Sequence, residues 1–332
     1  MSDSNQSKSN LIIVHTPLQS LIAEKIIENN RNETFELIMI HHSHSKLSNQ
    51  KFEYYFDRLK EKCEKSYRLC IPLFSKLKML YMLYKMIFKF YGKKYDTIFV
   101  SSIDMAQVQG LLSHLKFNAI ESFDDGSANL MKDTFFDSKH YTISLKHFIR
   151  DILICNRVDI KNLKSKIRKH WTIYPNYENI ITAPKKVIKL ISLEEINHGE
   201  ESDLKTIKIY LGQPVFEPDI NKCINLTEKV VNYFGIENYF PHPRENYTIY
   251  GVKYINTNLI IEDYIIQKLN ENPRVIFEIY SLYSSALLHL VNIPRLTLFS
   301  IKPNEVFFNK RNIRDYYRMV NDLGIKIKEI DF

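Results

Sequence analysis

The chain has 332 residues, of which 45% are hydrophobic and 25% charged, with 46 lysines and arginines against 38 acidic residues. This length suffices for two domains, and the composition is typical of a globular protein rather than a disordered or fibrous one. No run of about 18 uncharged apolar residues occurs, so no transmembrane helix is expected, and the polar start lacks a signal peptide.

Charge and cysteine spacing narrow the class of protein further. The net charge of +8 favours anionic partners, but no nucleic-acid-binding motif accompanies it. Four cysteines at unrelated spacings predict free thiols in a reducing cytoplasm. We therefore expect a cytoplasmic protein that binds anionic ligands and no nucleic acid.

Strand-like and helix-like segments alternate through the first half of the chain. Strands are expected at 11–14, 35–40, 97–101 and 118–123, and helices at 20–29, 76–91 and 105–115. Such alternation predicts a parallel, doubly wound sheet. The histidine-rich tract 41–44 is expected to be a loop after the second strand, with no cysteine or acidic partner for a metal.

A second alternation follows a mixed, charged stretch. Strands are expected at 206–211, 239–240, 275–279 and 295–299, and helices at 221–234, at 261–269 and from about Ser284. The sequence therefore predicts an α/β protein with two Rossmann-like, doubly wound domains. They comprise residues 1–195 and 206–332, with a linker at about 196–205.

The segment 76–94 mixes lysines with large apolar side chains at helix-like spacing. An interfacial helix lying on anionic lipid has this pattern, and so does a core helix with lysines along its exposed edge.

Polar residues follow several predicted strands, at the edge where open α/β sheets bind ligands. Asp124, Asp125 and Gly126 come directly after one strand. Adjacent carboxylates there point to opposite sides, so one could take a proton from an attacking hydroxyl while the other braces the turn. A plain turn and a Mg²⁺ or Mn²⁺ site are the alternatives.

His242 lies between two prolines at the end of another predicted strand. The prolines stiffen the backbone and hold the histidine in an extended conformation. Such a histidine could meet a leaving group, although a Pro-bounded surface loop has the same pattern.

Two further segments of the second half could bind a phosphorylated ligand. Ser284 and Ser285 open a helix after a strand, where hydroxyls and backbone N–H groups can bind an anion or simply cap the helix. Glu262, at the start of the preceding helix, could accept hydrogen bonds from ribose or could simply be a first-turn glutamate that the helix dipole favours. In the loop after the strand 206–211, Glu217 and Asp219 could each act as a general base or be solvated acids.

Read together, these segments resemble bacterial sialyltransferases of glycosyltransferase family 52, the lipooligosaccharide α-2,3-sialyltransferases. The matching stretches are His15-Thr-Pro-Leu-Gln19, Phe123-Asp-Asp-Gly-Ser-Ala-Asn-Leu130, Leu211-Gly-Gln-Pro214, Pro241-His-Pro-Arg244, Ile261-Glu-Asp-Tyr264 and Phe277 through Ser285. They occur in the family's order and span nearly the whole chain. The resemblance implies a GT-B fold, in which two Rossmann-like domains face a central cleft.

The resemblance also implies the chemistry: transfer of sialic acid from CMP-sialic acid to a terminal galactose, with inversion and without a metal or other cofactor. By similarity, His242 contacts the CMP phosphate and acts as the acid, and the serine pair holds that phosphate. Other donor-site residues implied in this way are Gly212, Gln213, Pro243, Arg244 and Glu262, and those implied on the acceptor side are Thr16, Gln19 and Gly126. The general base remains open among Asp219, Glu217, Asp124 and Asp125.

Partners implied by the resemblance are the galactose-terminated glycan and a second copy of the chain in a homodimer. Membrane association is expected to be peripheral, on the inner face of the bacterial inner membrane. The alternatives are a transferase of another sugar, such as glucose, and an inactive glycan-binding protein.

Overall fold

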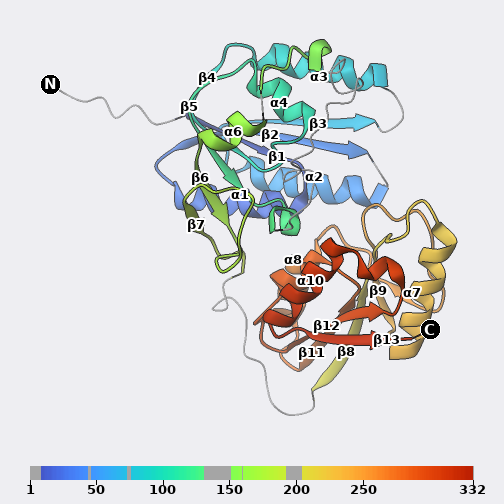
Figure 1. Ribbon diagram of the computed structural model, residues 1–332. Helices are drawn as coiled ribbons and strands as arrows, with labels where there is room; N and C mark the ends of the chain where they lie inside the picture. Colours follow the sequence, from blue (N-terminus) through green and yellow to red (C-terminus); the bar gives the residue numbers. More distant parts are fainter. Residues whose placement is uncertain are drawn as a thin grey trace. The chain divides into compact units, whose positions relative to one another are not determined.

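The computed structural model describes residues 9–43, 46–72, 76–130, 151–158, 160–191 and 204–331 (Figure 1). The chain divides into two compact units. The first comprises Met1–Ser43 and Phe52–Leu190, and the second comprises His44–Lys51 and Ile191–Phe332. Residues 196–203, which make up most of the predicted linker, lie outside the described residues.

The first unit is built on a seven-stranded sheet in the order β3-β2-β1-β4-β5-β6-β7. Every neighbouring pair of these strands is parallel. The central strands are apolar along most of their length because both faces of the sheet are covered. The strands are β1 (Ser9–Val14), β2 (Thr34–Ser43), β3 (Lys65–Pro72), β4 (Lys94–Val100), β5 (Lys116–Phe123), β6 (Ile167–Thr172) and β7 (Lys185–Val187).

Helices cover both faces of this sheet and enclose two hydrophobic cores (Figure 1). Side chains of α3 and α4 pack into one core, and side chains of α1 and α2 pack into the other. The helical segments are α1 (Pro17–Asn29), α2 (Lys46–Lys60, of which Phe52–Lys60 belong to this unit), α3 (Lys76–Phe90), α4 (Ala106–Leu112), the 3₁₀ turn η1 (Gly126–Leu130) and α6 (Ile160–Lys166).

The second unit has a six-stranded parallel sheet in the order β10-β9-β8-β11-β12-β13. Its strands are β8 (Lys205–Leu211), β9 (Asn238–Phe240), β10 (Lys253–Tyr254), β11 (Val275–Ser281), β12 (Leu296–Pro303) and β13 (Lys326–Ile330). Its helical segments are α7 (Ile220–Phe234), α8 (Ile261–Glu271), α9 (Ser285–His289), η3 (Val306–Asn309) and α10 (Arg311–Asp322).

Each sheet reverses its strand order at one place. In the first unit the reversal lies between β1 and β4, and in the second it lies between β8 and β11. Loops on the two sides of such a switch point diverge and leave a crevice beyond the carboxyl ends of the strands. The predicted fold class, an α/β protein with two doubly wound Rossmann-like units, is confirmed.

Some sequence-based element assignments were wrong. The helices α2, α6 and α10 and the strands β3, β6, β7, β10 and β13 were not predicted. The tract 41–44 was assigned to a loop although β2 runs through Ser43. Arg295 does not begin a strand, because its φ of 60° is left-handed and β12 starts one residue later. Among the described helices, none is both long and apolar enough to cross a bilayer.

Candidate active site

In the second unit, the predicted donor-binding loops follow three neighbouring strands. β8 pairs with β9 on one side and with β11 on the other. Gly212 follows β8, His242 follows β9 and Ser284 follows β11. Because all three strands are parallel, the loops leave the same edge of the sheet, at its switch point.

Gln213 links the loop after β8 to the loop after β11. Its Oε1 accepts hydrogen bonds from Ser281 Oγ and from the backbone N–H of Tyr283, both at 3.0 Å. The backbone N–H of Gly212 also donates to the carbonyl of Phe240 at the end of β9, at 2.9 Å. The first loop is therefore tied to the segments that carry His242 and Ser284.

The His242 ring is held in one tautomer by its own loop. The backbone N–H of Arg244 donates to His242 Nδ1 at 3.2 Å. A nitrogen that accepts a hydrogen bond carries no proton, so the neutral ring has its N–H at Nε2. His242 is half-buried.

Glu245 is a buried carboxyl group that the sequence analysis did not identify as functional. Its Oε2 accepts a hydrogen bond from the hydroxyl of Tyr239 at 3.0 Å, and its backbone N–H donates to the carbonyl of His242 at 3.0 Å. Its Oε1 is buried without a hydrogen-bond partner in the described part of the chain. Burial raises the pKa of Glu245 to about 7, and its only sequence signal is its place directly after the Pro-His-Pro-Arg segment.

The candidate bases of the second unit are both exposed and both have structural partners. Asp219 is the N-cap of α7, where its Oδ1 accepts the backbone N–H of Lys222 at 3.0 Å. Glu217 Oε2 lies 3.5 Å from the guanidinium of Arg244. The latter contact joins the loop after β8 to the segment that carries His242.

Ser284 caps α9, as one of the two interpretations of the serine pair, helix capping, predicts. Its Oγ accepts the backbone N–H of Ala286 at 3.3 Å, and its carbonyl accepts the hydroxyl of Tyr316 at 2.8 Å. Ser285 is the first residue of the helix. Glu262 lies in the first turn of α8 and is buried, and its Oε1 accepts a hydrogen bond from His289 Nδ1 at 2.7 Å.

Lys51, which belongs to the second unit by its contacts, is a buried cation that sequence reasoning missed. Its ammonium lies 4.3 Å from the centroid of the Phe240 ring. Burial lowers the pKa of Lys51 to about 8, although the charge of Glu262 opposes this shift.

In the first unit, Thr16 and Gln19, two of the predicted acceptor-side residues, belong to one hydrogen-bonded network beyond the ends of β1, β4 and β5. Thr16 caps α1 by accepting the backbone N–H of Gln19 at 3.2 Å. Gln19 in turn accepts the N–H of His15 at 2.6 Å, and its Nε2 donates to Ser102 and Asp125. Ser102 Oγ donates to the other oxygen of Asp125 at 3.0 Å.

The two adjacent aspartates have different surroundings. Asp124 is fully buried and accepts hydrogen bonds from His170 Nε2 at 2.9 Å, the Ile173 N–H at 2.7 Å and Asn179 Nδ2 at 3.3 Å. Burial raises the pKa of Asp125, and its hydrogen bonds to Gln19 and Ser102 oppose that shift. Gly126 follows with a φ of 64°, the left-handed conformation that glycine permits without strain.

Two further residues of this edge were not among the predicted site residues. His15 Nδ1 donates to the carbonyl of Ile40 at 3.0 Å, and burial lowers the pKa of His15 to about 4. Its Nε2 and the Oδ1 of Asp104 are buried without hydrogen-bond partners in the described part of the chain. His15 and Asp104 both come shortly after a strand, as Asp124 and Asp125 do. That position in the sequence could have identified them as candidate site residues.

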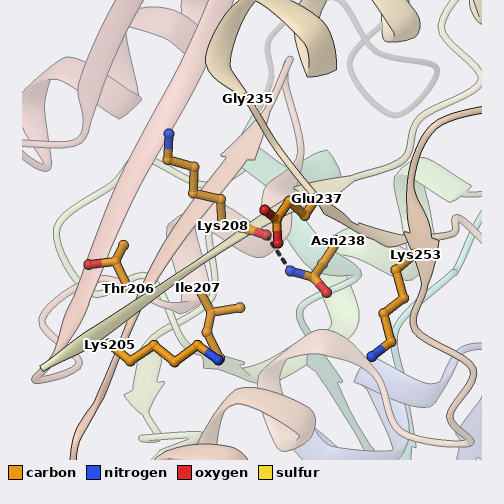
Figure 2. A pocket seen from close by; sticks show the side chains of 8 residues that line it. All are labelled: Lys205, Thr206, Ile207, Lys208, Gly235, Glu237, Asn238 and Lys253. Carbon is orange, nitrogen blue, oxygen red and sulfur yellow. Dashed lines mark hydrogen bonds between the residues drawn. The ribbon is translucent and has the colours of Figure 1, made fainter.

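A pocket of the second unit lies at the other end of its sheet (Figure 2). It is lined by the first residues of β8 and by residues just before and within β9, and Asn238 Nδ2 donates there to the carbonyl of Lys208 at 3.1 Å. None of the predicted site residues lines it. Because doubly wound sheets bind ligands at the carboxyl ends of their strands, this pocket is not the candidate active site.

Comparison with known proteins assigns the chain to a family. It is 36% identical to the CMP-N-acetylneuraminate:β-galactoside α-2,3-sialyltransferase of Pasteurella multocida over 285 residues, which are 85% of this chain and 87% of that protein. It is 32% identical to the N-acetyllactosaminide α-2,3-sialyltransferase of Haemophilus influenzae over 97% of this chain and 100% of that one. A crystal structure of the glycotransferase of kitacinnamycin matches 98% of this chain and 87% of its own, with a TM-score of 0.48 and 7% identity. The family model for glycosyltransferase family 52 matches residues 32–305, and the chain belongs to this family.

Proposed function

We propose that this protein is a sialyltransferase, which moves sialic acid from CMP-sialic acid to a terminal galactose of a bacterial surface glycan. The observation that carries the proposal is the placement of His242 and Ser284 after the two strands that flank β8, at the switch point of the second sheet. The α-2,3-sialyltransferase activity named for two relatives supports the choice of donor.

In the proposed reaction, CMP leaves as the anomeric carbon takes on oxocarbenium character. Negative charge grows on the phosphate, and His242 Nε2 would donate its N–H to that charge. Ser284 and Ser285 would add a hydroxyl and backbone N–H groups. Donors that are already in place stabilise a transition state without reorganisation. Gly212, Gln213, Pro243 and Arg244 would complete this side of the donor site, and Glu262 would bind the ribose.

For the general base we propose Asp219. Only its Oδ1 carries a hydrogen bond in the described part of the chain, which leaves Oδ2 to accept a proton. Asp124 is a poor candidate because three donors already hold its carboxylate. Glu217 is paired with Arg244, and Asp125 is held by Gln19 and Ser102. A single displacement assisted by this base would invert the anomeric configuration.

The network of the first unit would bind the acceptor glycan. Thr16, Gln19 and Gly126 are the residues implied for this side by the family resemblance. The structure adds His15 Nε2 and Asp104 Oδ1, two buried hydrogen-bond acceptors without donors in the described residues. Sugar hydroxyls would supply such donors.

The test is the release of CMP from CMP-sialic acid in the presence of lactose. We expect release with the purified protein, and a loss of about a hundredfold or more with His242→Ala, the scale of a general acid. EDTA should leave the rate unchanged, because the proposed reaction is metal-independent. Absence of release with lactose and with other galactosides would contradict the proposal. Stabilisation by UDP or GDP, but not by CMP, would indicate a transferase of another sugar.

We extend the proposal to peripheral membrane contact through the outer face of α3 (Figure 1). Leu77, Tyr81 and Phe88 on this helix are 82%, 67% and 86% exposed, and Lys85 and Lys89 are exposed beside them. Exposed apolar side chains flanked by lysines fit an anionic lipid surface. The protein should float with vesicles of anionic lipid and not with neutral ones, and replacing Leu77 and Phe88 by serine should abolish flotation.

A matched control for flotation is Tyr233→Ser, which removes another aromatic side chain, 68% exposed, from α7. Retention of flotation by the α3 variant would contradict this part of the proposal. The family resemblance also supports a homodimer, which light scattering of the purified protein tests.

A further inference from the structure

Glu262 and His289 form a buried pair between two helices of the second unit. Glu262 lies in the first turn of α8, and His289 is the last residue of α9. Their side chains are 5% and 1% exposed, and His289 Nδ1 lies 2.7 Å from Glu262 Oε1. Such a short contact to a carboxylate is a charge-assisted hydrogen bond, the stronger kind in proteins.

The hydrogen bond uses only one oxygen of the carboxylate. In the described part of the chain, Glu262 Oε2 takes part in no hydrogen bond. This oxygen is also not fully covered by protein atoms. The hydrogen bond to Oε1 limits rotation of the carboxylate, so the direction of Oε2 is fixed as well. A fixed acceptor binds a hydroxyl with less loss of conformational entropy than a freely rotating one.

We propose that His289 is a positioning residue that holds Glu262 for the ribose of the donor nucleotide, and that the pair makes the site selective for ribonucleotides over deoxyribonucleotides. This inference rests on the proposed function, because it requires a CMP-bearing donor. His289 touches no part of the nucleotide in this arrangement. It acts through the orientation of the Glu262 carboxylate.

Selectivity follows from the cost of an acceptor that the bound nucleotide encloses without giving it a donor. When the ribose hydroxyl is absent, Oε2 loses its partner, and a site built to bind a hydroxyl rejects the analogue that lacks it. Without His289 the carboxylate can turn toward other donors or water. The affinity for CMP should then decrease, while the affinity for a deoxynucleotide should change little.

The experiment measures binding of CMP, 2′-deoxy-CMP and 3′-deoxy-CMP by calorimetry. For the wild-type protein we expect at least one deoxy analogue to bind about tenfold more weakly than CMP, the equivalent of one hydrogen bond to a charged group. His289→Ala and Glu262→Gln should reduce this ratio to about twofold or less. His289→Asn should preserve the ratio, because its Nδ2 can donate from the position of the histidine Nδ1.

Kinetics provides a second readout. With His289→Ala, the KM for CMP-sialic acid should rise by about tenfold and kcat should change by less than threefold, the pattern of lost ground-state binding. Ile293→Val, a change at a buried apolar residue in the loop after α9, is the control for loss of packing. It should leave the ratio of affinities unchanged. Melting temperatures of all variants identify any that fail to fold.

The outcomes separate the two proposals. If the wild-type protein does not bind CMP, the proposed function is wrong and this inference is wrong with it. If it binds CMP but His289→Ala keeps the full ratio, or His289→Asn is no better than alanine, the inference alone is wrong. If His289→Ala fails to fold, Glu262→Gln and His289→Asn decide: loss of the ratio in the first and its retention in the second support the inference, and any other pattern overturns it.

Discussion

The carboxyl group of Glu245 lies in the space that a side chain on Gly212 would need. A Cβ atom built on Gly212 would meet Glu245 Oε1 and the hydroxyl of Tyr239 well inside van der Waals contact. The glycine is therefore required for close approach, not for its backbone angles. Since Gly212 and Glu245 belong to the loops after β8 and β9, their contact fixes the spacing of the two loops.

The first prediction is that Gly212→Ala destabilises the second unit. The added methyl group displaces Glu245 and Tyr239 and should cost about 2 kcal/mol of unfolding free energy, as overpacking typically does. CMP affinity should decrease at the same time, because the displaced segment carries His242. Denaturant unfolding and calorimetry measure the two effects.

Glu245→Ala provides the matched second variant for a double-mutant cycle. Removing this side chain relieves the closest of the clashes and leaves the one with the Tyr239 hydroxyl. The double variant should therefore be more stable than the sum of the single effects predicts. Strictly additive effects of the two changes would show that the alanine at position 212 does not press against Glu245.

The second prediction concerns the pH dependence that Glu245 confers on stability. Burial raises the pKa of this carboxyl in the folded state from about 4.5 to about 7. The folded state therefore holds the proton more tightly than the unfolded state, so this contribution is fully present below pH 4.5 and is lost as the pH rises to 7. Glu245→Gln cannot ionise and should escape this loss.

The measurement compares the melting temperatures of Glu245→Gln and the wild-type protein across this range. The difference should grow in favour of glutamine between about pH 4.5 and 7 and stay constant above. Tyr239 faces the same carboxyl, but burial raises its pKa and it stays neutral throughout. Glu217, the nearby acid that also raises the pKa of Glu245, can be replaced by glutamine as a control, which should leave a pH-dependent difference. A difference independent of pH would show that Glu245 is not protonated in the folded state.

The sequence predicted the two doubly wound sheets because their central strands are short apolar runs separated by amphipathic helices. It failed at β3, an edge strand in which only Leu69 and Ile71 are buried. An edge strand with one covered face lacks the continuous apolar run that marks a central parallel strand.

The candidate site was predictable only in part. Residues such as His242 and Ser284 come directly after strands, and the topology of a parallel sheet brings such residues to one edge. Partners such as His170 and His289 could not be predicted. They are 46 and 27 residues from Asp124 and Glu262, and no local pattern marks a contact that tertiary packing creates.

The third prediction separates the two roles of Asp219. As the N-cap of α7 it stabilises the helix, and as the proposed base it removes a proton. Asp219→Ser retains a capping oxygen and should unfold like the wild-type protein, whereas Asp219→Ala should lose about 1 kcal/mol. Both variants should lose about a hundredfold or more in kcat, because neither has a carboxylate.

Glu217→Gln is the matched control for this comparison, since it removes the neighbouring carboxylate. It should retain most of the activity. If Asp219→Ser keeps its activity and Glu217→Gln loses it, the base is Glu217. If both variants remain active, the base belongs to the first unit.

The fourth prediction is that replacing Asp124 mainly lowers the stability of the protein, whereas replacing Asp125 mainly weakens binding of the acceptor. Both oxygens of Asp124 accept hydrogen bonds from buried donors, among them His170 and the backbone N–H of Ile173. An asparagine there must turn an amide toward one of these donors and should cost about 3 kcal/mol, the loss typical of a broken buried pair. Asp125 interacts with Ser102, whose hydroxyl can rotate to accept as well as donate. Asp125→Asn should therefore cost only about 1 kcal/mol of unfolding free energy.

Urea unfolding of the two variants, followed by the rate of CMP release per folded molecule, tests this difference. Asp124→Asn should reduce mainly the amount of folded protein, and Asp125→Asn should mainly raise the KM for the acceptor. Equal stability of the two variants would mean that the buried hydrogen bonds of Asp124 do not hold the end of β5 in place.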